Sequence, residues 1–246
     1  MRSPNYSRRR VLALTGLFLC GLLLGARGWA QEVQPIELKT TDGPLVLQPL
    51  KHGSVLATFK GKSYYIDPAQ LPAGAKYGKA DAIFITHEHG DHLDPKMVEL
   101  LRKPETQIIT NARCAEKLGA GTVMKNGDTR KVLDVMVEAV PAYNIERTQF
   151  HPKGSDNGFV INFGGKRVYF AADTEATPEM KALKNIDIAF LPINLPYTMP
   201  PKDAVEAARA FHPKILVPYH QGQSNPQEVA DALKGTGIDV RVLKLP

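Results

Sequence analysis

Short apolar segments separated by glycines and charged residues mark the first part of the chain. Segments 45–50, 54–60 and 62–67 are β-branched or aromatic, and glycine turns separate them, which predicts antiparallel hairpins. A continuous apolar segment at 81–86 follows, which predicts a strand buried on both faces.

The pattern then changes to an alternation of strands and helices. Pro95 suits the first turn of a helix over residues 94–101. The later expected elements are a strand at 107–110, a helix at 112–118, a strand at 131–142, a hairpin of strands 158–163 and 167–172, a helix at 202–211 and a strand at 214–220. We predict a single α/β domain, a two-sheet sandwich with its helices outside.

The first thirty residues have the features of an export signal. Ser7-Arg8-Arg9-Arg10 resembles a twin-arginine motif, an apolar run spans residues 11–24, and Gly28-Trp29-Ala30 is a small-residue cleavage region. We expect cleavage after Ala30 and a periplasmic or secreted domain over residues 31–246. Two alternatives stay open: an uncleaved anchor, although the run is short for a bilayer span, and a lipoprotein at Cys20, although Leu19 is not the usual small residue.

Charge and cysteine content change once this segment is set aside. The chain has 31 basic and 25 acidic residues, for a net charge of +6, but residues 1–30 hold five of the arginines and no acidic residue. The remaining 26 basic and 25 acidic residues give about +1, which gives no electrostatic case for nucleic acid or for stable membrane association. Cys114 alone remains, so no internal disulfide forms and the core must supply stability.

Four potential metal ligands crowd into six residues directly after the strand at 81–86. His87 and His89 alternate with Glu88, so in extended backbone their imidazoles point the same way and can bind one cation. Asp91 and His92 then turn toward a second position nearby. Ligands at the carboxyl end of a strand are typical of sites in α/β sheets.

Two later segments deliver ligands to the same sheet edge. Asp173 closes the strand at 167–172, where a carboxylate can bridge two metals, although a turn residue would also fit. His220 ends the strand at 214–220. His212 lies at the opposite end of that strand, and we interpret it as structural.

These segments together resemble the metallo-β-lactamase superfamily over nearly the whole mature chain. The resemblance rests on His87-x-His89-x-Asp91-His92, Asp173-Thr174 and Pro218-Tyr219-His220. Segments 141–144, 150–154, 157–160 and 197–199 further resemble the branch of predicted metal-dependent hydrolases that includes ascorbate-6-phosphate lactonase. The resemblance implies a four-layer αββα sandwich with one or two metal ions, usually Zn²⁺ and sometimes Mn²⁺ or Fe²⁺.

The same resemblance implies a division of ligands. By that pattern His87 and His89 hold the first metal, Asp91, His92 and His220 hold the second, and Asp173 bridges them. Many members add a third histidine to the first metal directly after a strand, but here that position reads Ala142-Tyr143-Asn144. His151 is the only histidine between His92 and Asp173, so it is the candidate, either as a ligand or as a substrate contact.

Function follows from the metals. A bound cation lowers the pKa of a coordinated water toward about 7, and the resulting hydroxide can attack a small-molecule lactone, ester or phosphoester. Asp91 is the candidate for orienting that water or moving its proton. The chain lacks the glycine-histidine turn of class B β-lactamases, which argues against antibiotic hydrolysis. The alternative is an exported metal-binding protein of the same fold without turnover, and a homo-oligomer is compatible with either.

Two neighbouring segments have two interpretations each. Residues 194–201 form either a pocket wall or a rigid start to the following helix, and His52 lies either beside the site or in a surface turn.

Overall fold

The computed structural model describes residues 1, 33–71, 76–243 and 245. The predicted signal peptide, its cleavage site and Cys20 lie outside these residues. Within this part, fourteen strands form two sheets of seven. The first sheet contains, in spatial order, β1 (Ile36–Thr40), β2 (Gly43–Lys51), β3 (Ser54–Phe59), β4 (Lys62–Ile66), β5 (Ala82–Phe84), β6 (Gln107–Thr110) and β7 (Thr122–Val123).

The second sheet repeats this plan from the C-terminal half of the chain. In spatial order it contains β14 (Asp239–Val240), β13 (Ile215–Tyr219), β12 (Ile188–Pro192), β11 (Lys166–Phe170), β10 (Asp156–Phe163), β9 (Val135–Ala142) and β8 (Thr129–Val132). In each sheet the first four strands in sequence pair antiparallel and the last four pair parallel. Parallel strands bring their carboxyl ends to one edge, and functional sites of α/β sheets form there.

Aromatic side chains fill the space between the two sheets. Phe59 and Tyr64 of the first sheet meet Phe163 of the second edge-on, with ring centroids 5.6 and 5.4 Å apart, and Phe84 meets Phe159 at 5.5 Å. All five are buried. The cluster to which they belong draws residues from both sheets, so the inner faces form one shared core.

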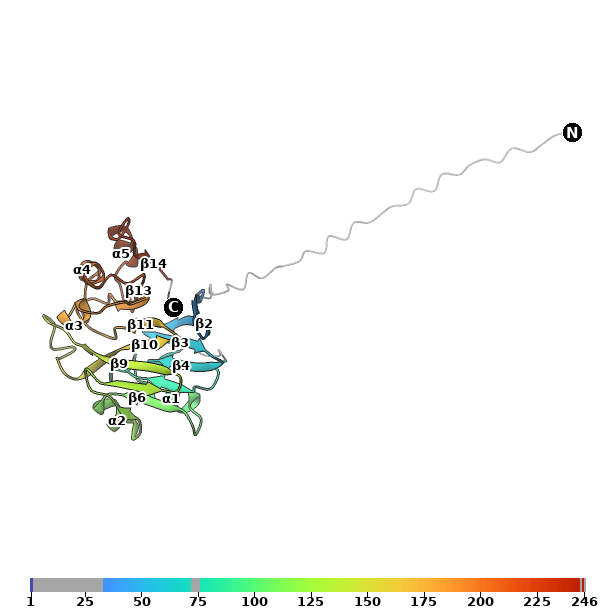
Figure 1. Ribbon diagram of the computed structural model, residues 1–246, viewed down its shortest axis with the longest axis horizontal. Coiled ribbons are helices and arrows are strands. Elements are labelled where there is room, and N and C mark those ends of the chain that lie inside the picture. The colour runs from blue at the N-terminus through green and yellow to red at the C-terminus, as the bar shows by residue number, and fades with distance from the viewer. Residues whose placement is uncertain (2–32, 72–75, 244, 246) are drawn as a thin grey trace. The chain divides into compact units, whose positions relative to one another are not determined.

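Helices cover the outer faces. The first sheet carries α1 (Pro95–Leu101) and α2 (Ala112–Leu118), whose buried side chains pack on those of β5 and β6. The second carries α3 (Pro178–Lys181), α4 (Pro201–Phe211) and α5 (Pro226–Ala232). Figure 1 shows the two helix groups on opposite sides of the paired sheets. The predicted αββα sandwich is therefore confirmed.

Element boundaries show where the sequence pattern was insufficient. The hairpin of β10 and β11 across Gly164-Gly165 is confirmed. The single strand predicted at 131–142 is wrong, because the chain reverses at Leu133-Asp134 and the segment forms the β8–β9 hairpin. Leu133 has a φ of 52°, a left-handed conformation that nothing in a leucine predicts. Strands β1 and β7 were not predicted, and no bounds were predicted for β12 and β14.

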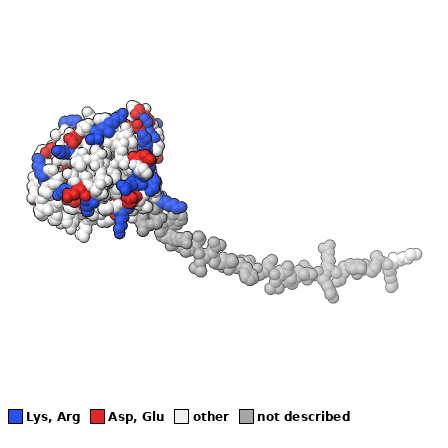
Figure 2. Space-filling view, turned by 90° about the horizontal axis from the view of Figure 1, so that it is seen from below, with Lys and Arg blue, Asp and Glu red and all other residues white. Residues whose placement is uncertain are grey.

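The surface agrees with the near-neutral charge of residues 31–246. Basic and acidic side chains are interspersed on the face shown in Figure 2. Among the residues that the structure describes, no helix has the length and hydrophobicity needed to cross a bilayer.

Candidate metal centre

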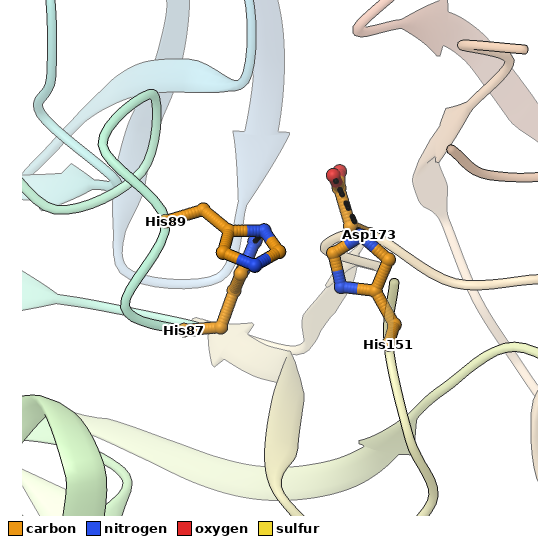
Figure 3. A group of neighbouring side chains, drawn as sticks. All are labelled: His87, His89, His151 and Asp173. Atoms are coloured by element: carbon orange, nitrogen blue, oxygen red, sulfur yellow. Dashed lines mark hydrogen bonds and ion pairs between the residues drawn. The ribbon is translucent and has the colours of Figure 1, made fainter. Parts of the chain in front are cut away.

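A first group of potential ligands gathers where three loops meet. His87 and His89 follow β5, His151 lies between β9 and β10, and Asp173 follows β11. His87 Nε2 lies 3.2 Å from His89 Nδ1, and His151 Nε2 lies 3.4 Å from Asp173 Oδ2. Figure 3 shows the four side chains facing one another, and one ligand atom of each lies within 4.8 Å of the others. Three imidazoles and a carboxylate can hold one cation here.

A second group shares Asp173. His220 Nε2 lies 3.0 Å from His92 Nε2, and Asp173 Oδ1 lies 3.4 Å from His92 Nε2 and 3.3 Å from His220 Nε2. Ligand atoms bound tetrahedrally at about 2.1 Å would be about 3.4 Å apart, so these separations suit one shared cation.

Asp91 lies at the edge of the second group. Its Oδ2 lies 3.3 Å from His220 Nε2 but 4.0 Å from His92 Nε2. The nearest imidazole is that of His52, whose Nε2 lies 3.1 Å away. Whereas the side chains of His92 and His220 are at most 1% exposed, that of Asp91 is 31% exposed. Asp91 therefore faces both the second group and solvent.

Asp173 carries the clearest sign that the residues suit a metal. Its Oδ1 is buried and has no hydrogen-bond partner among the residues that the structure describes. Leaving a carboxylate oxygen unpaired in the interior is costly. That oxygen faces two imidazole nitrogens, His92 Nε2 and His220 Nε2, which lie 3.0 Å apart, and a cation at this point would contact all three. Nitrogen and oxygen ligands of this kind suit Zn²⁺, Mn²⁺ and Fe²⁺.

Asp67 holds the second group from behind, and the sequence analysis did not assign it to the site. Its Oδ2 lies 2.8 Å from His92 Nδ1 and accepts a hydrogen bond from Thr86 Oγ1 at 2.7 Å, while its Oδ1 accepts one from the Thr86 amide at 2.8 Å. Thr86 Oγ1 also lies 3.0 Å from His87 Nδ1. A single carboxylate thus fixes the ring of His92 and, through Thr86, that of His87.

One sequence signal could have found Asp67. The segments 61–67 and 165–173 both run from a glycine turn through an aromatic strand to an aspartate. Asp67 and Asp173 follow corresponding strands, β4 and β11, in the two sheets, which agrees with that echo.

Asp156 performs a similar task for His151. It is buried, and its Oδ2 lies 3.4 Å from His151 Nδ1. Its Oδ1 accepts a hydrogen bond from an Arg113 guanidinium nitrogen at 2.7 Å, and the other guanidinium nitrogen pairs with Glu88 at 3.1 Å. Sequence reasoning missed this aspartate because it begins β10, whereas the predicted ligands follow the carboxyl ends of strands.

Close backbone packing brings the β2–β3 turn onto the site. The His52 ring lies 3.7 Å from that of His220, centroid to centroid, and the His220 amide donates to the His52 carbonyl at 3.3 Å. A Cβ at Gly53 would lie 2.9 Å from His92 Cε1, so only glycine fits there without movement. Of the two interpretations of His52, the structure favours the position beside the site.

Several site residues adopt a left-handed backbone. The φ angles are 44° at Asp67, 63° at Ala172 and 44° at His220. Such conformations cost on the order of 1–2 kcal/mol in residues other than glycine and cluster at functional sites. The superfamily that the sequence resembles usually has glycine at the position of Ala172, and the positive φ angle there explains why glycine is favoured.

Burial and neighbouring charges shift the protonation equilibria of the site. Burial lowers the pKa of His87 well below its ordinary value. Burial also opposes the charge of His92, but the carboxylates of Asp173 and Asp67 outweigh it and raise the pKa of His92 well above the usual range. For Asp173, burial opposes ionisation, yet His220 and His92 hold its pKa well below the ordinary value. The buried carboxylates thus require positive charge beside them, which a divalent cation would supply.

The loop that carries His151 is tied to the segment after Asp173. The Glu175 carboxylate accepts hydrogen bonds from the amides of Ile145 and Glu146, both at 2.8 Å, and from Arg147 Nη1 at 2.6 Å. Thr174 Oγ1 donates to the carbonyl of Tyr143 at 2.8 Å. The two loops therefore hold each other in position.

A cavity of about 440 Å³ opens above the two groups. Its lining comprises His52, His89, Asp91, Phe150, His151, Asp173, Asn194, Tyr197 and His220. The expected wall contribution of residues 194–201 is present in Asn194 and Tyr197, and Pro201 also begins α4, so both interpretations of this segment hold.

The structure thus brings together every residue predicted for the site. His212 lies apart, as the C-cap of α4, with its Nε2 3.1 Å from the Thr236 carbonyl oxygen. His151 lies in the first group despite its offset from the strand end, because the loop folds back and its carbonyl accepts from the Asn144 amide at 2.8 Å. The residues that sequence reasoning missed are Asp67, Asp156, Phe150 and Glu175.

The model of the beta-lactamase superfamily domain matches residues 47–220, a span that contains every residue of both groups. The chain belongs to the metallo-β-lactamase superfamily. This identification confirms the resemblance inferred from the metal-ligand motifs.

Relatives within the superfamily support the assignment. The chain is 32% identical over 214 residues to a UPF0173 metal-dependent hydrolase of Thermus thermophilus, covering 79% of this chain and 94% of that one. A crystal structure of a proposed metal-dependent hydrolase from Parabacteroides distasonis is 49% identical, with a TM-score of 0.84, over 87% of this chain and all of that one. Igni18, a metallo hydrolase from Ignicoccus hospitalis, is 25% identical with a TM-score of 0.68, over 80% and 94% of the two chains.

Proposed function

We propose that this protein is a metal-dependent hydrolase that cleaves a small-molecule lactone, ester or phosphoester, with Zn²⁺ at one or both positions. One observation carries the proposal. Asp173 belongs to both ligand groups, and its buried Oδ1, which lies between His92 and His220, has no hydrogen-bond partner among the described residues. The names of its relatives, which include metal-dependent hydrolases, agree with this assignment.

The bound cations would supply Lewis acidity and an activated water below the 440 Å³ cavity. The chain's own residues do the rest. Asp91 lines the cavity and lies between His52 and His220, so it is placed to orient the attacking water and accept its proton. Burial opposes ionisation of Asp91, but its contacts with His220 and His52 lower its pKa below the ordinary value, so at neutral pH it is ionised and can accept a hydrogen bond from the water.

A binding protein without turnover is the competing function. It would need the ligand groups but not the cavity, nor a partly exposed carboxylate at the cavity floor. Both of those features are present, which favours the hydrolase.

The test compares turnover with and without metal. Purified residues 31–246 are assayed on generic lactones, carboxyl esters and phosphodiesters, first as the metal-loaded protein and then after chelation and metal restoration. We expect hydrolysis of at least one class that chelation abolishes and metal restores. His212→Asn is the matched control, because it removes a histidine outside the site and asparagine tolerates the φ of 50° found there. Bound metal with no hydrolysis of any class would favour the binding protein.

We also propose export through a twin-arginine-type signal and cleavage after Ala30. Trp29 is the only tryptophan of the chain, so the mature protein should show tyrosine emission alone. Tryptophan fluorescence from purified periplasmic material would contradict this cleavage site.

A further inference from the structure

The cavity above the ligand groups has two chemically different sides. One consists of histidines and aspartates, most of which would hold metal. The other consists of Phe150, Asn194 and Tyr197. These three side chains would not bind metal, so they can contact the substrate and determine which substrates bind.

We propose that this site takes an uncharged ester or lactone bearing an aromatic group, in preference to a phosphate ester or another polyanion. The inference rests on the proposed hydrolytic function and narrows it to a substrate class. Hydrolysis would add one water across the acyl C–O bond: the water oxygen bonds to the carbonyl carbon, the leaving oxygen takes a proton, and a carboxylic acid forms.

The aromatic side of the cavity is a paired surface. Phe150 and Tyr197 meet edge to face with ring centroids 5.0 Å apart. Asn144 fixes the pair, because its Nδ2 donates to the Tyr197 carbonyl at 2.7 Å and to that of Arg147, three residues before Phe150, at 3.2 Å. Tyr197 is still 47% exposed, so its ring has surface left to cover a ligand. Aromatic surfaces of this kind favour flat, apolar groups.

No lysine or arginine lines the cavity among the described residues. Three basic side chains on adjoining segments already have acidic partners. Arg147 contacts Glu175 at 2.6 Å, Arg113 contacts Asp156 at 2.7 Å, and Lys153 contacts Glu179 at 3.2 Å. Cations at the site could bind the oxygens of the scissile group, but the described lining of the cavity offers no basic side chain to any further anionic group of a phosphate ester or a carboxylated substrate.

Asn194 supplies the neutral polar contact. It is 8% exposed, it lines the cavity, and its side-chain amide has no hydrogen-bond partner among the described residues. A Cβ at Gly222 would collide with Asn194 Oδ1, so only glycine at this position leaves room for the Asn194 side chain. An amide can hydrogen-bond an ester or lactone oxygen without requiring charge on the ligand.

The experiment uses the metal-loaded protein and matched substrates. Dihydrocoumarin and δ-valerolactone share a six-membered lactone but differ in the fused aromatic ring. 4-Nitrophenyl acetate and 4-nitrophenyl phosphate share a leaving group but differ in charge. We expect kcat/KM for the acetate to exceed that for the phosphate by about a hundredfold or more, after each is divided by its uncatalysed rate.

Variants of the aromatic side test the other half of the inference. Tyr197→Ala and Phe150→Ala should raise KM for dihydrocoumarin roughly tenfold with little change in kcat, and should leave δ-valerolactone within about twofold. Tyr197→Phe keeps the ring and should retain the wild-type KM for dihydrocoumarin.

The outcomes distinguish failure of the substrate-class inference from failure of the proposed hydrolytic function. Preferred hydrolysis of 4-nitrophenyl phosphate, or equal effects of Tyr197→Ala on both lactones, would overturn this inference alone. A metal-loaded protein that hydrolyses none of these or the generic substrates would overturn the proposed function and this inference with it.

Discussion

Asp67 Oδ2 lies 2.8 Å from His92 Nδ1, and the side chains of both residues are completely buried. This contact joins the first sheet's β4–β5 edge to the metal centre, because Asp67 also accepts two hydrogen bonds from Thr86 directly before His87. The carboxylate therefore orients ligands of both groups without itself belonging to either.

The first prediction concerns this carboxylate. Asp67→Asn keeps the shape but removes the charge beside His92, so we expect metal affinity at the second group to fall about 10- to 100-fold. Competition of the metal-loaded protein against a chromophoric chelator measures the change. Asp42→Asn, an exposed aspartate in the β1–β2 turn, is the control. Unchanged affinity in Asp67→Asn would show that His92 is held by its packing alone.

Asp156 leads to a prediction for the first group. Asp156→Asn weakens the contact that orients His151, so we expect about 10- to 100-fold weaker binding of the ion held by His87, His89 and His151, while the second group keeps its affinity. Calorimetric titration resolves the two steps. If both ions weaken equally, the separate role assigned to Asp156 is wrong.

Glu175 should govern stability more than metal binding. Its side chain is 5% exposed and accepts three hydrogen bonds from residues 145–147, so Glu175→Gln should lower the free energy of unfolding by about 1.5–3 kcal/mol. Urea denaturation of the metal-free protein measures this. The neighbouring Glu146→Gln should stay within about 0.5 kcal/mol, since that side chain is 78% exposed. Equal effects of the two substitutions would contradict the stabilising role assigned to Glu175.

Asp91 should separate binding from turnover. Asp91→Asn retains the first ligand group, so we expect at least one bound ion per chain but a fall in kcat of about a hundredfold or more. Metal analysis and turnover are measured on the same preparation. A variant with full metal content and full turnover would remove Asp91 from both roles.

The pH dependence of the metal-free protein follows from His151. Burial opposes its charge, but Asp156 and Asp173 raise its pKa to about 9, above the 6.5 of the unfolded chain. The protonated ring therefore stabilises the fold fully below pH 6.5, and this stabilisation is lost as the pH rises through 9. Thermal unfolding should show that His151→Gln destabilises the protein more at pH 6 than at pH 10. A difference that does not vary with pH would contradict the shift.

Sequence reasoning recovered the fold and the residues at strand ends because both depend on local patterns. His87, Asp173 and His220 each follow an apolar strand, and the carboxyl ends of such strands meet at one edge. Asp67 gave a weaker signal, since its value comes from contact with His92, 25 residues later.

The remaining features depend on long-range packing and on loop geometry. The pairing of Phe150 with Tyr197 joins loops 47 residues apart, and no periodicity marks it. The reversal at Leu133 needs a left-handed leucine, which local propensity disfavours. Both are decided by the tertiary structure, which outweighs the preferences of the local sequence.

The central claim is that the His and Asp groups hold metal around Asp173. Metal content per chain, measured by mass spectrometry on residues 31–246 after supplementation and dialysis, tests it most directly. We predict about one to two equivalents in the wild type and in His212→Asn, and less than about half of that in Asp173→Ala. A metal-free wild-type protein, or an Asp173→Ala variant with wild-type metal content, would contradict the account.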